Sequence, residues 1–167
     1  MAISAAPIKW HGGKSYQAKH IISLMPPRCK KPNNPSPDDP GYLHYVEPYF
    51  GGGAVLLEND PEGISEVAND INGELINFWK TMAEPACFSE FYRHLIMGMP
   101  VSEEQFKRLE NPFWPDSIQR AVAFFVRCRQ SLSGRMKGFC GISKERTRGG
   151  MNEQVSAWLG AIEGLPE

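Results

Sequence analysis

A glycine turn with acidic residues near it is the feature of this sequence best suited to chemistry. The turn reads Glu47-Pro-Tyr-Phe-Gly-Gly-Gly53, and Asp70 follows it at the expected end of the next strand. Glycines let the backbone approach a ligand closely, and a carboxylate at that strand end accepts hydrogen bonds from ribose hydroxyls. The pattern therefore indicates a nucleoside site, with a purely structural tight turn as the alternative.

Two phosphate-binding patterns fail in this chain. The dinucleotide fingerprint G-x-G-x-x-G needs a third glycine where the sequence has Leu56. A G-x-x-x-x-G-K-S loop ending on Gly13-Lys14-Ser15 needs its first glycine where the sequence has Ile8. The turn thus favours a nucleoside cofactor without phosphates, of which S-adenosylmethionine is the common one.

Three segments together resemble one family. They are Ile8-Lys-Trp-His-Gly-Gly-Lys14, Val46-Glu-Pro-Tyr-Phe-Gly-Gly-Gly-Ala-Val55 and Asn69-Asp-Ile-Asn72. In this order they are similar to the Dam-like (D12 class) DNA adenine N6-methyltransferases, which carry K-W-x-G-G-K, E-P-F-x-G-x-G and D-I-N segments. His11 and Tyr49 depart from the alanine and phenylalanine usual there. The resemblance implies S-adenosylmethionine as methyl donor and double-stranded DNA as substrate.

The resemblance also implies a set of cofactor-binding residues. They are Trp10, Gly12, Gly13 and Lys14 over the cofactor, Glu47, Gly51 and Gly53 beneath it, and Asp70 on the ribose. A lysine and an aromatic ring would suit the carboxylate and sulfonium ends of this cofactor. Judged from the residues alone, Trp10 could instead be a core anchor and Lys14 a solvated surface lysine.

A concentration of positive charge marks the second half of the chain. Between Arg120 and Arg148 the only acid is Glu145, although the whole chain has a net charge of -1. Lysine and arginine supply most non-specific DNA affinity by neutralising phosphates. Because the family has its target-recognition region here, the residues predicted to contact DNA are Arg127, Arg129, Arg135 and Lys137. Arg135 is the first choice, and simple solvation of a loop is the alternative.

The catalytic motif of the family is missing from this sequence. That motif, [DNS]-P-P-[YFW], holds the adenine amine and stacks on the flipped-out base. Asp39-Pro-Gly-Tyr42 and Asn111-Pro-Phe-Trp114 are the nearest segments, and neither follows an apolar strand. We therefore assign no catalytic residue and expect a fragment that does not methylate DNA alone, for which the missing C-terminal segment is a candidate partner.

Two other functions stay open at this point. One is a non-catalytic module that binds DNA or cofactor, and the other is a methyltransferase acting on RNA or protein. The four cysteines and four histidines lack metal-ligand spacing. The longest apolar run, 121–126, is too short to span a bilayer, and no signal pattern opens the chain. We expect a cytoplasmic protein without metal or membrane span.

The elements that must position the glycine turn alternate between strand and helix. Apolar periodicity predicts a helix over 15–25, strands over 43–47 and 64–68, a helix from about Ala54, and another capped by Asn72. This order predicts an α/β fold, a partial Rossmann-like cofactor-binding sheet, over residues 1–79.

Helices dominate the expected second part, residues 80–167. Ser102 and Asp116 have capping spacing, and the helix after Asp116 should bury an aromatic face. We expect an extended loop over 131–150, where glycines and arginines are dense, and a last helix over 153–162. This mainly helical part would be the target-recognition region.

Overall fold

The computed structural model describes residues 7–29, 41–98, 101–110, 114–141, 145–148 and 150–163. Backbone contacts divide them into two compact units, one built on Gly13–Ile71 and the other on Pro7–Gly12 with Asn72–Glu167. The structural division therefore falls after Ile71, and the functional boundary between residues 79 and 80 remains a prediction.

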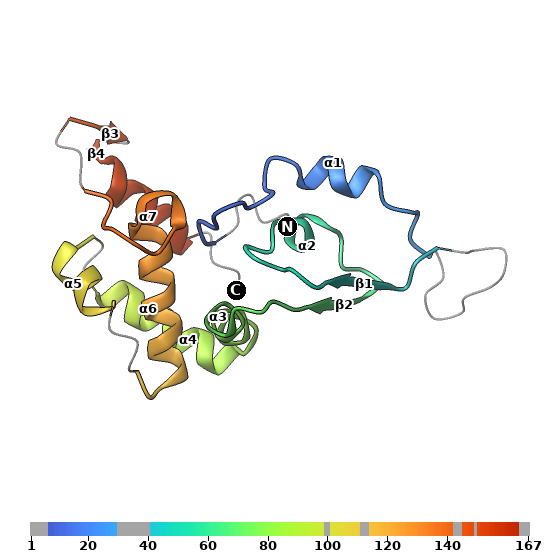
Figure 1. Ribbon diagram of the computed structural model, residues 1–167, viewed down its shortest axis with the longest axis horizontal. Helices are drawn as coiled ribbons and strands as arrows, with labels where there is room; N and C mark the ends of the chain where they lie inside the picture. The colour runs from blue at the N-terminus through green and yellow to red at the C-terminus, as the bar shows by residue number, and fades with distance from the viewer. Residues whose placement is uncertain are drawn as a thin grey trace. The chain divides into compact units, whose positions relative to one another are not determined.

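The first unit contains a parallel pair of strands. Strand β1 (His44–Glu47) lies beside β2 (Ser65–Ala68) with Glu47 opposite Ala68. Helix α2 (Ala54–Glu58) connects the two strands and contacts α1 (Ala18–Ser23) (Figure 1). The predicted order of strand, turn, helix and strand is confirmed for this segment.

Helix α1 is shorter than the helix predicted over 15–25. Gln17 stands at its N-cap position without a side-chain hydrogen bond to the helix, so the first turn gains no capping stabilisation. Leu24, beyond its C-terminal end, is exposed. Of the residues expected on its inner face, only Ala18 is fully buried.

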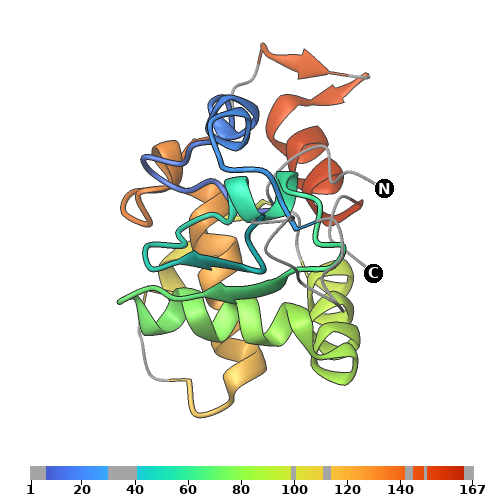
Figure 2. The ribbon, with the colours of Figure 1, turned by 90° about the vertical axis from the view of Figure 1, so that its right-hand side faces the viewer.

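The second unit is mainly helical, as predicted. Its elements are α3 (Gly73–Ala83), α4 (Pro85–Met97), α5 (Glu103–Arg108), α6 (Ser117–Gln130), the short 3-10 helix η1 (Leu132–Gly134), the antiparallel pair β3 (Thr147–Arg148) and β4 (Met151–Asn152), and α7 (Glu153–Glu163). Helix α3 is seen end-on in Figure 1 and lengthwise in Figure 2, where it crosses α6.

Aromatic rings from four helices form the core of the second unit. Phe78 of α3 is fully buried and stacks on Phe125 of α6 at a centroid distance of 6.1 Å. Phe91 of α4 meets Phe78 edge-on at 5.9 Å, and Trp158 of α7 meets Phe125 at 5.5 Å. Such offset and edge-on pairs are the arrangements that aromatic quadrupoles favour. The predicted burial of one face of α6 is confirmed.

Three predicted helix caps are present. The Asn72 side chain accepts hydrogen bonds from the N–H groups of Glu74 and Leu75 at the start of α3. Ser102 and Asp116 accept from the residues three positions later. Each cap satisfies backbone donors that the first helical turn leaves without intrahelical partners.

The expectation of one extended loop over 131–150 is wrong for the described residues there. Cys140 donates its N–H to the Gln130 carbonyl at 2.7 Å, and the Ser131 hydroxyl accepts the Met136 N–H at 2.8 Å. These bonds close a compact turn after α6, and β3 and β4 follow as a short hairpin. The reason is the buried Ser131, whose hydroxyl gives the Met136 N–H a hydrogen-bond partner that the glycine-rich composition did not suggest.

No helix in the described parts of the chain is both long and apolar enough to cross a membrane.

Candidate functional site: a glycine turn and a basic turn

Hydrogen bonds join the glycine turn to the end of β2. The Asn69 N–H donates to the Glu47 carbonyl at 2.8 Å, and the Phe50 N–H donates to the Asn69 carbonyl at 2.9 Å. The Gly51 N–H then donates to the Asp70 carboxylate, Oδ2, at 2.9 Å. The end of β1, the turn and the end of β2 are therefore one connected structure.

Glycine is required at two positions of this turn. Gly51 has φ of 54° and Gly53 has φ of 69°, both in the left-handed region that other residues rarely adopt. Gly53 is also the N-cap residue of α2, so the turn leads directly into a helix whose first N–H groups point toward it. Four predicted site residues, Glu47, Gly51, Gly53 and Asp70, are thus brought together.

Glu47 is half-buried at the end of β1, and burial and two neighbouring groups act on its carboxyl. Burial raises the pKa of Glu47 above its usual range, while the Tyr45 hydroxyl and the charge of Lys14 partly lower it again. The Tyr45 hydroxyl donates to Glu47 Oε1 at 2.5 Å. The predicted site residue Lys14 therefore lies near enough to Glu47 to act on it electrostatically.

Tyr45 and Glu66 are the polar residues of this region that the sequence reasoning missed. Tyr45 stands opposite Glu66 in the β1–β2 register, and both are half-buried. Burial and the charge of Glu47 raise the pKa of Glu66. The available signal was the alternation Tyr45-x-Glu47, which points both side chains to one face of a strand.

The segment Lys9–Lys14 is divided between the two units. Trp10 and Gly12 belong to the second unit, where the Trp10 ring lies 6.1 Å from that of Phe124. Gly13 and Lys14 belong to the first. The aromatic contact fits the alternative that Trp10 is a core anchor, and its role over the cofactor remains a prediction, as does that of Gly12.

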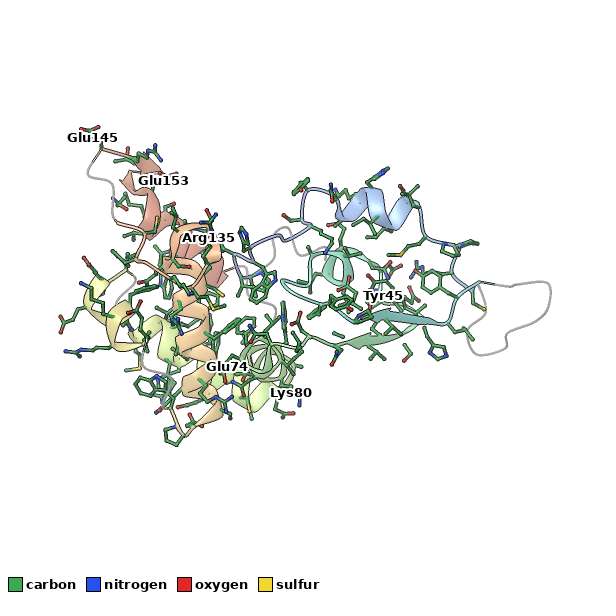
Figure 3. All side chains as sticks on the ribbon, viewed as in Figure 1. Tyr45, Glu74, Lys80, Arg135, Glu145 and Glu153 are labelled. Atoms are coloured by element: carbon green, nitrogen blue, oxygen red, sulfur yellow. The ribbon has the colours of Figure 1, made fainter. Side chains whose placement is uncertain are left out.

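The four candidate DNA-binding cations lie in the last turn of α6 and in the basic turn that follows it, residues 131–140, and they differ in environment. Arg127 donates to the Met136 carbonyl at 2.9 Å, and Arg129 donates to the Ala157 carbonyl at 3.0 Å. Both are half-buried and hold backbone of the fold. Arg135 and Lys137 are exposed (Arg135 is labelled in Figure 3).

Close packing fixes the position of this basic turn within the second unit. Gly134 has φ of 70°, and a Cβ there would lie 2.1 Å from the Lys9 carbonyl oxygen. A side chain at this position is excluded by both the backbone conformation and the contact. The turn that carries Arg135 is therefore seated against Lys9.

A small hollow beside this contact contains two cationic side chains. Lys9, Arg129 and Gln130 line it, together with Val101, Cys140, Ala157 and Trp158. Burial and the charge of Arg129 lower the pKa of Lys9, and Glu153 partly offsets this. Within the described residues neither cation has a carboxylate within salt-bridge distance. Such a hollow suits an anion.

Arg120, at the start of the positive stretch, forms an ion pair within the second unit. Its guanidinium pairs with Glu74 of α3 at 2.5 Å.

The near matches to the missing motif, 39–42 and 111–114, lie largely outside the described residues. In the described part of the chain no cluster of three or more histidine, cysteine or carboxylate side chains could hold a metal ion.

With this geometry established, comparisons with known proteins decide the family. A family model described as D12 class N6 adenine-specific DNA methyltransferase matches residues 10–138, which is most of the chain. The chain belongs to this family. The match includes the glycine turn, Asp70 and the basic turn, so the resemblance suggested by the three sequence segments is confirmed.

Two curated proteins illustrate the relationship. A type II methyltransferase, M1.LlaDCHI, from Lactococcus lactis subsp. cremoris is 38% identical over 76 residues, which are 46% of this chain and 22% of that protein. A DNA N-6-adenine-methyltransferase from Escherichia phage P1 is 28% identical over 130 residues, 75% of this chain and 15% of that protein. The D12-family chain described here thus matches a minor part of each relative's length.

Proposed function

We propose that this chain provides the S-adenosylmethionine-binding part and a DNA-contacting part of a DNA adenine N6-methyltransferase. The observation that carries the proposal is the Gly51–Asp70 hydrogen bond, because it joins the glycine turn to the carboxylate predicted to bind ribose. Membership of the D12 class supplies the reaction class. In this proposal β1, α2 and β2 are the cofactor-binding portion of a Rossmann-like sheet.

Each residue of the turn has a distinct role in the proposal. Gly51 and Gly53 let the cofactor approach the backbone, and Glu47 receives the amino-acid end of S-adenosylmethionine. Asp70 uses its carboxylate both to hold the Gly51 N–H and to accept ribose hydroxyls. Lys14 lies near Glu47 and would meet the cofactor's carboxylate.

Calorimetric titration of the full chain tests the cofactor assignment. We expect S-adenosylmethionine and its demethylated product to bind, and NAD and ATP not to bind. Asp70→Ala should weaken binding by about 1.5–3 kcal/mol, the worth of hydrogen bonds to a charged group. Glu62→Ala, which removes an exposed carboxylate from the same unit, is the matched control and should leave affinity unchanged. Binding of NAD in preference to S-adenosylmethionine would overturn the assignment.

The DNA part of the proposal rests on the basic turn. Arg135 and Lys137 are exposed, and the hollow between Lys9 and Arg129 offers two further cations. Arginine and lysine bind phosphates by charge and guanine edges by paired hydrogen bonds. We therefore propose that duplex DNA contacts this turn.

We further propose that the chain alone transfers no methyl group to DNA. The sequence holds no [DNS]-P-P-[YFW] tetrapeptide to orient the adenine amine. A radiolabelled methyl-transfer assay on adenine-containing duplex, with protein in excess, should stay at background. Transfer well above background would show that 111–114 or a partner replaces the motif.

A further inference from the structure

Tyr45 is a feature of the first unit that the proposed function does not yet use. Its phenol is half-buried, and its hydroxyl donates to Glu47 Oε1 at 2.5 Å from two residues away on the same strand. In Figure 3 Tyr45 lies on the side of the β1–β2 pair where α2 lies. Because strand residues two apart point to one face, Tyr45 and Glu47 project together from the same face of β1, at the strand end that leads into the glycine turn.

We propose that Tyr45 is a positioning residue that fixes Glu47 so that its second carboxylate oxygen faces the ammonium group of S-adenosylmethionine. This inference rests on the proposed cofactor site. A free glutamate samples several rotamers, and a short hydrogen bond to one oxygen removes that freedom before the ligand arrives. By donating to the charged form, the phenol favours the ionised carboxylate and opposes the rise in the pKa of Glu47 that burial causes.

Glu66 explains why the ligand group at this place should be cationic. It stands opposite Tyr45 in the strand register, and its Oε1 is buried without a hydrogen-bond partner in the described structure. Two carboxylates near each other disfavour their joint ionisation, and the charge of Lys14 relieves this only in part. A bound ammonium group would supply the remaining positive charge.

The groups facing Glu47 within the first unit define the charge balance. They are Tyr45 on its own strand, Glu66 on β2 and Lys14 before α1. The carboxylate on α2, Glu58, pairs with Lys19 at 3.7 Å. The amino-acid end of the cofactor is therefore the part whose binding should respond to Tyr45.

Three ligands separate positioning of Glu47 from general support of the turn. S-adenosylmethionine and its demethylated product both carry the ammonium group, the second on a neutral thioether, whereas 5′-methylthioadenosine has the same nucleoside and a neutral thioether without the amino acid. Tyr45→Phe should weaken binding of the first two by about threefold to tenfold, the worth of one net hydrogen bond, and leave 5′-methylthioadenosine binding unchanged. Equal loss for all three ligands, or no loss for any, would overturn the positioning role.

The pH profile gives a second readout that a merely structural role would not change. Binding of the ammonium group requires ionised Glu47, so affinity falls as pH drops through the pKa of that carboxyl. Removing the phenol takes away a donor that lowers the pKa of Glu47, so the fall should begin at higher pH in Tyr45→Phe than in the wild type. An unshifted profile would contradict the proposal.

Further variants keep the result interpretable. Tyr92→Phe removes a phenol from α4 in the second unit and should change no affinity. If thermal melting shows that Tyr45→Phe is misfolded, Glu66→Gln is tested in its place. Glu66→Gln should weaken the binding of S-adenosylmethionine more than the binding of 5′-methylthioadenosine. Failure of wild-type protein to bind either ligand counts against the proposed function, whereas wild-type binding with unaltered Tyr45→Phe counts against this inference alone.

Discussion

The two units of this chain are stabilised by different interactions. In the first, the described buried apolar residues are small in number and include Ala18, Phe50 and Val55, while backbone and carboxylate hydrogen bonds shape the glycine turn. In the second, stacked aromatic rings around Phe78 are removed from water. Burial of apolar surface is the main favourable contribution to folding, and polar turns add little net stability. The unit proposed to bind cofactor is therefore the one whose stability should increase most when a ligand binds.

The largest effect is expected from breaking the second unit's aromatic core. Phe78→Ala removes a fully buried ring that contacts Phe91, Phe124 and Phe125, so the free energy of unfolding should fall by about 3–5 kcal/mol. Urea unfolding followed by tryptophan fluorescence measures this. Tyr49→Ala, at a ring that is 84% exposed, is the control and should stay within about 0.5 kcal/mol of the wild type. Similar losses for both variants would remove the contrast between the units.

Ligand binding should stabilise the first unit more than the second. At a hundredfold excess over its dissociation constant, S-adenosylmethionine should stabilise the state that binds it by about 2.7 kcal/mol. Hydrogen exchange should then slow at the amides of Phe50, Gly51 and Asn69, whose hydrogen bonds form the turn. We expect less change at core amides of α6. Uniform protection across both units would show that they unfold together.

Local signals in the sequence were sufficient for the glycine turn. A glycine turn, an acid after the next strand and a capping asparagine act over a few residues, and the structure has them as predicted at Gly51, Asp70 and Asn72. The parallel pairing of β1 with β2 is consistent with the predicted strand–helix–strand order, because that order favours a parallel crossover.

Long-range contacts could not be predicted in the same way. The division of 7–14 between two units depends on packing such as Trp10 against Phe124, far apart in the sequence. The turn after α6 depends on the Ser131 hydroxyl and on Gly134 packed at Lys9, which composition does not reveal. Arg127 and Arg129 looked equivalent to Arg135 as charges, but burial and carbonyl partners distinguish them.

Asn72, at the junction of the two units, offers a smaller test. Its side chain accepts two N–H groups of α3, so Asn72→Ala should lower the free energy of unfolding by about 1 kcal/mol. Asn72→Asp keeps an acceptor at the helix N-terminus and should restore most of that loss. Thermal unfolding of the three proteins measures the difference. A full loss in both variants would mean that the amide, rather than capping, is required.

The last comparison separates Arg135 of the basic turn from Arg127 of α6 by their salt dependence. The exposed Arg135 should meet DNA directly, whereas Arg127 holds the Met136 carbonyl. If Arg135 neutralises one phosphate, Arg135→Ala should make the slope of log affinity against log salt less steep by about one unit, since one fewer counterion is released. If it reads a base, the slope should hardly change and sequence preference should relax at a cost of about 1–3 kcal/mol.

Arg127 supplies the comparison for that measurement. Arg127→Ala removes the guanidinium that reaches the Met136 carbonyl, so it should lower stability, and because we expect Arg127 to meet no phosphate it should leave the salt slope unchanged. Fluorescence anisotropy of labelled duplex over a series of salt concentrations gives both slopes. The salt slope could instead change more for the Arg127 variant than for the Arg135 variant. In that case the half-buried cations, with the Lys9–Arg129 hollow beside them, would form the DNA contact, and the exposed turn would be only a solvated surface.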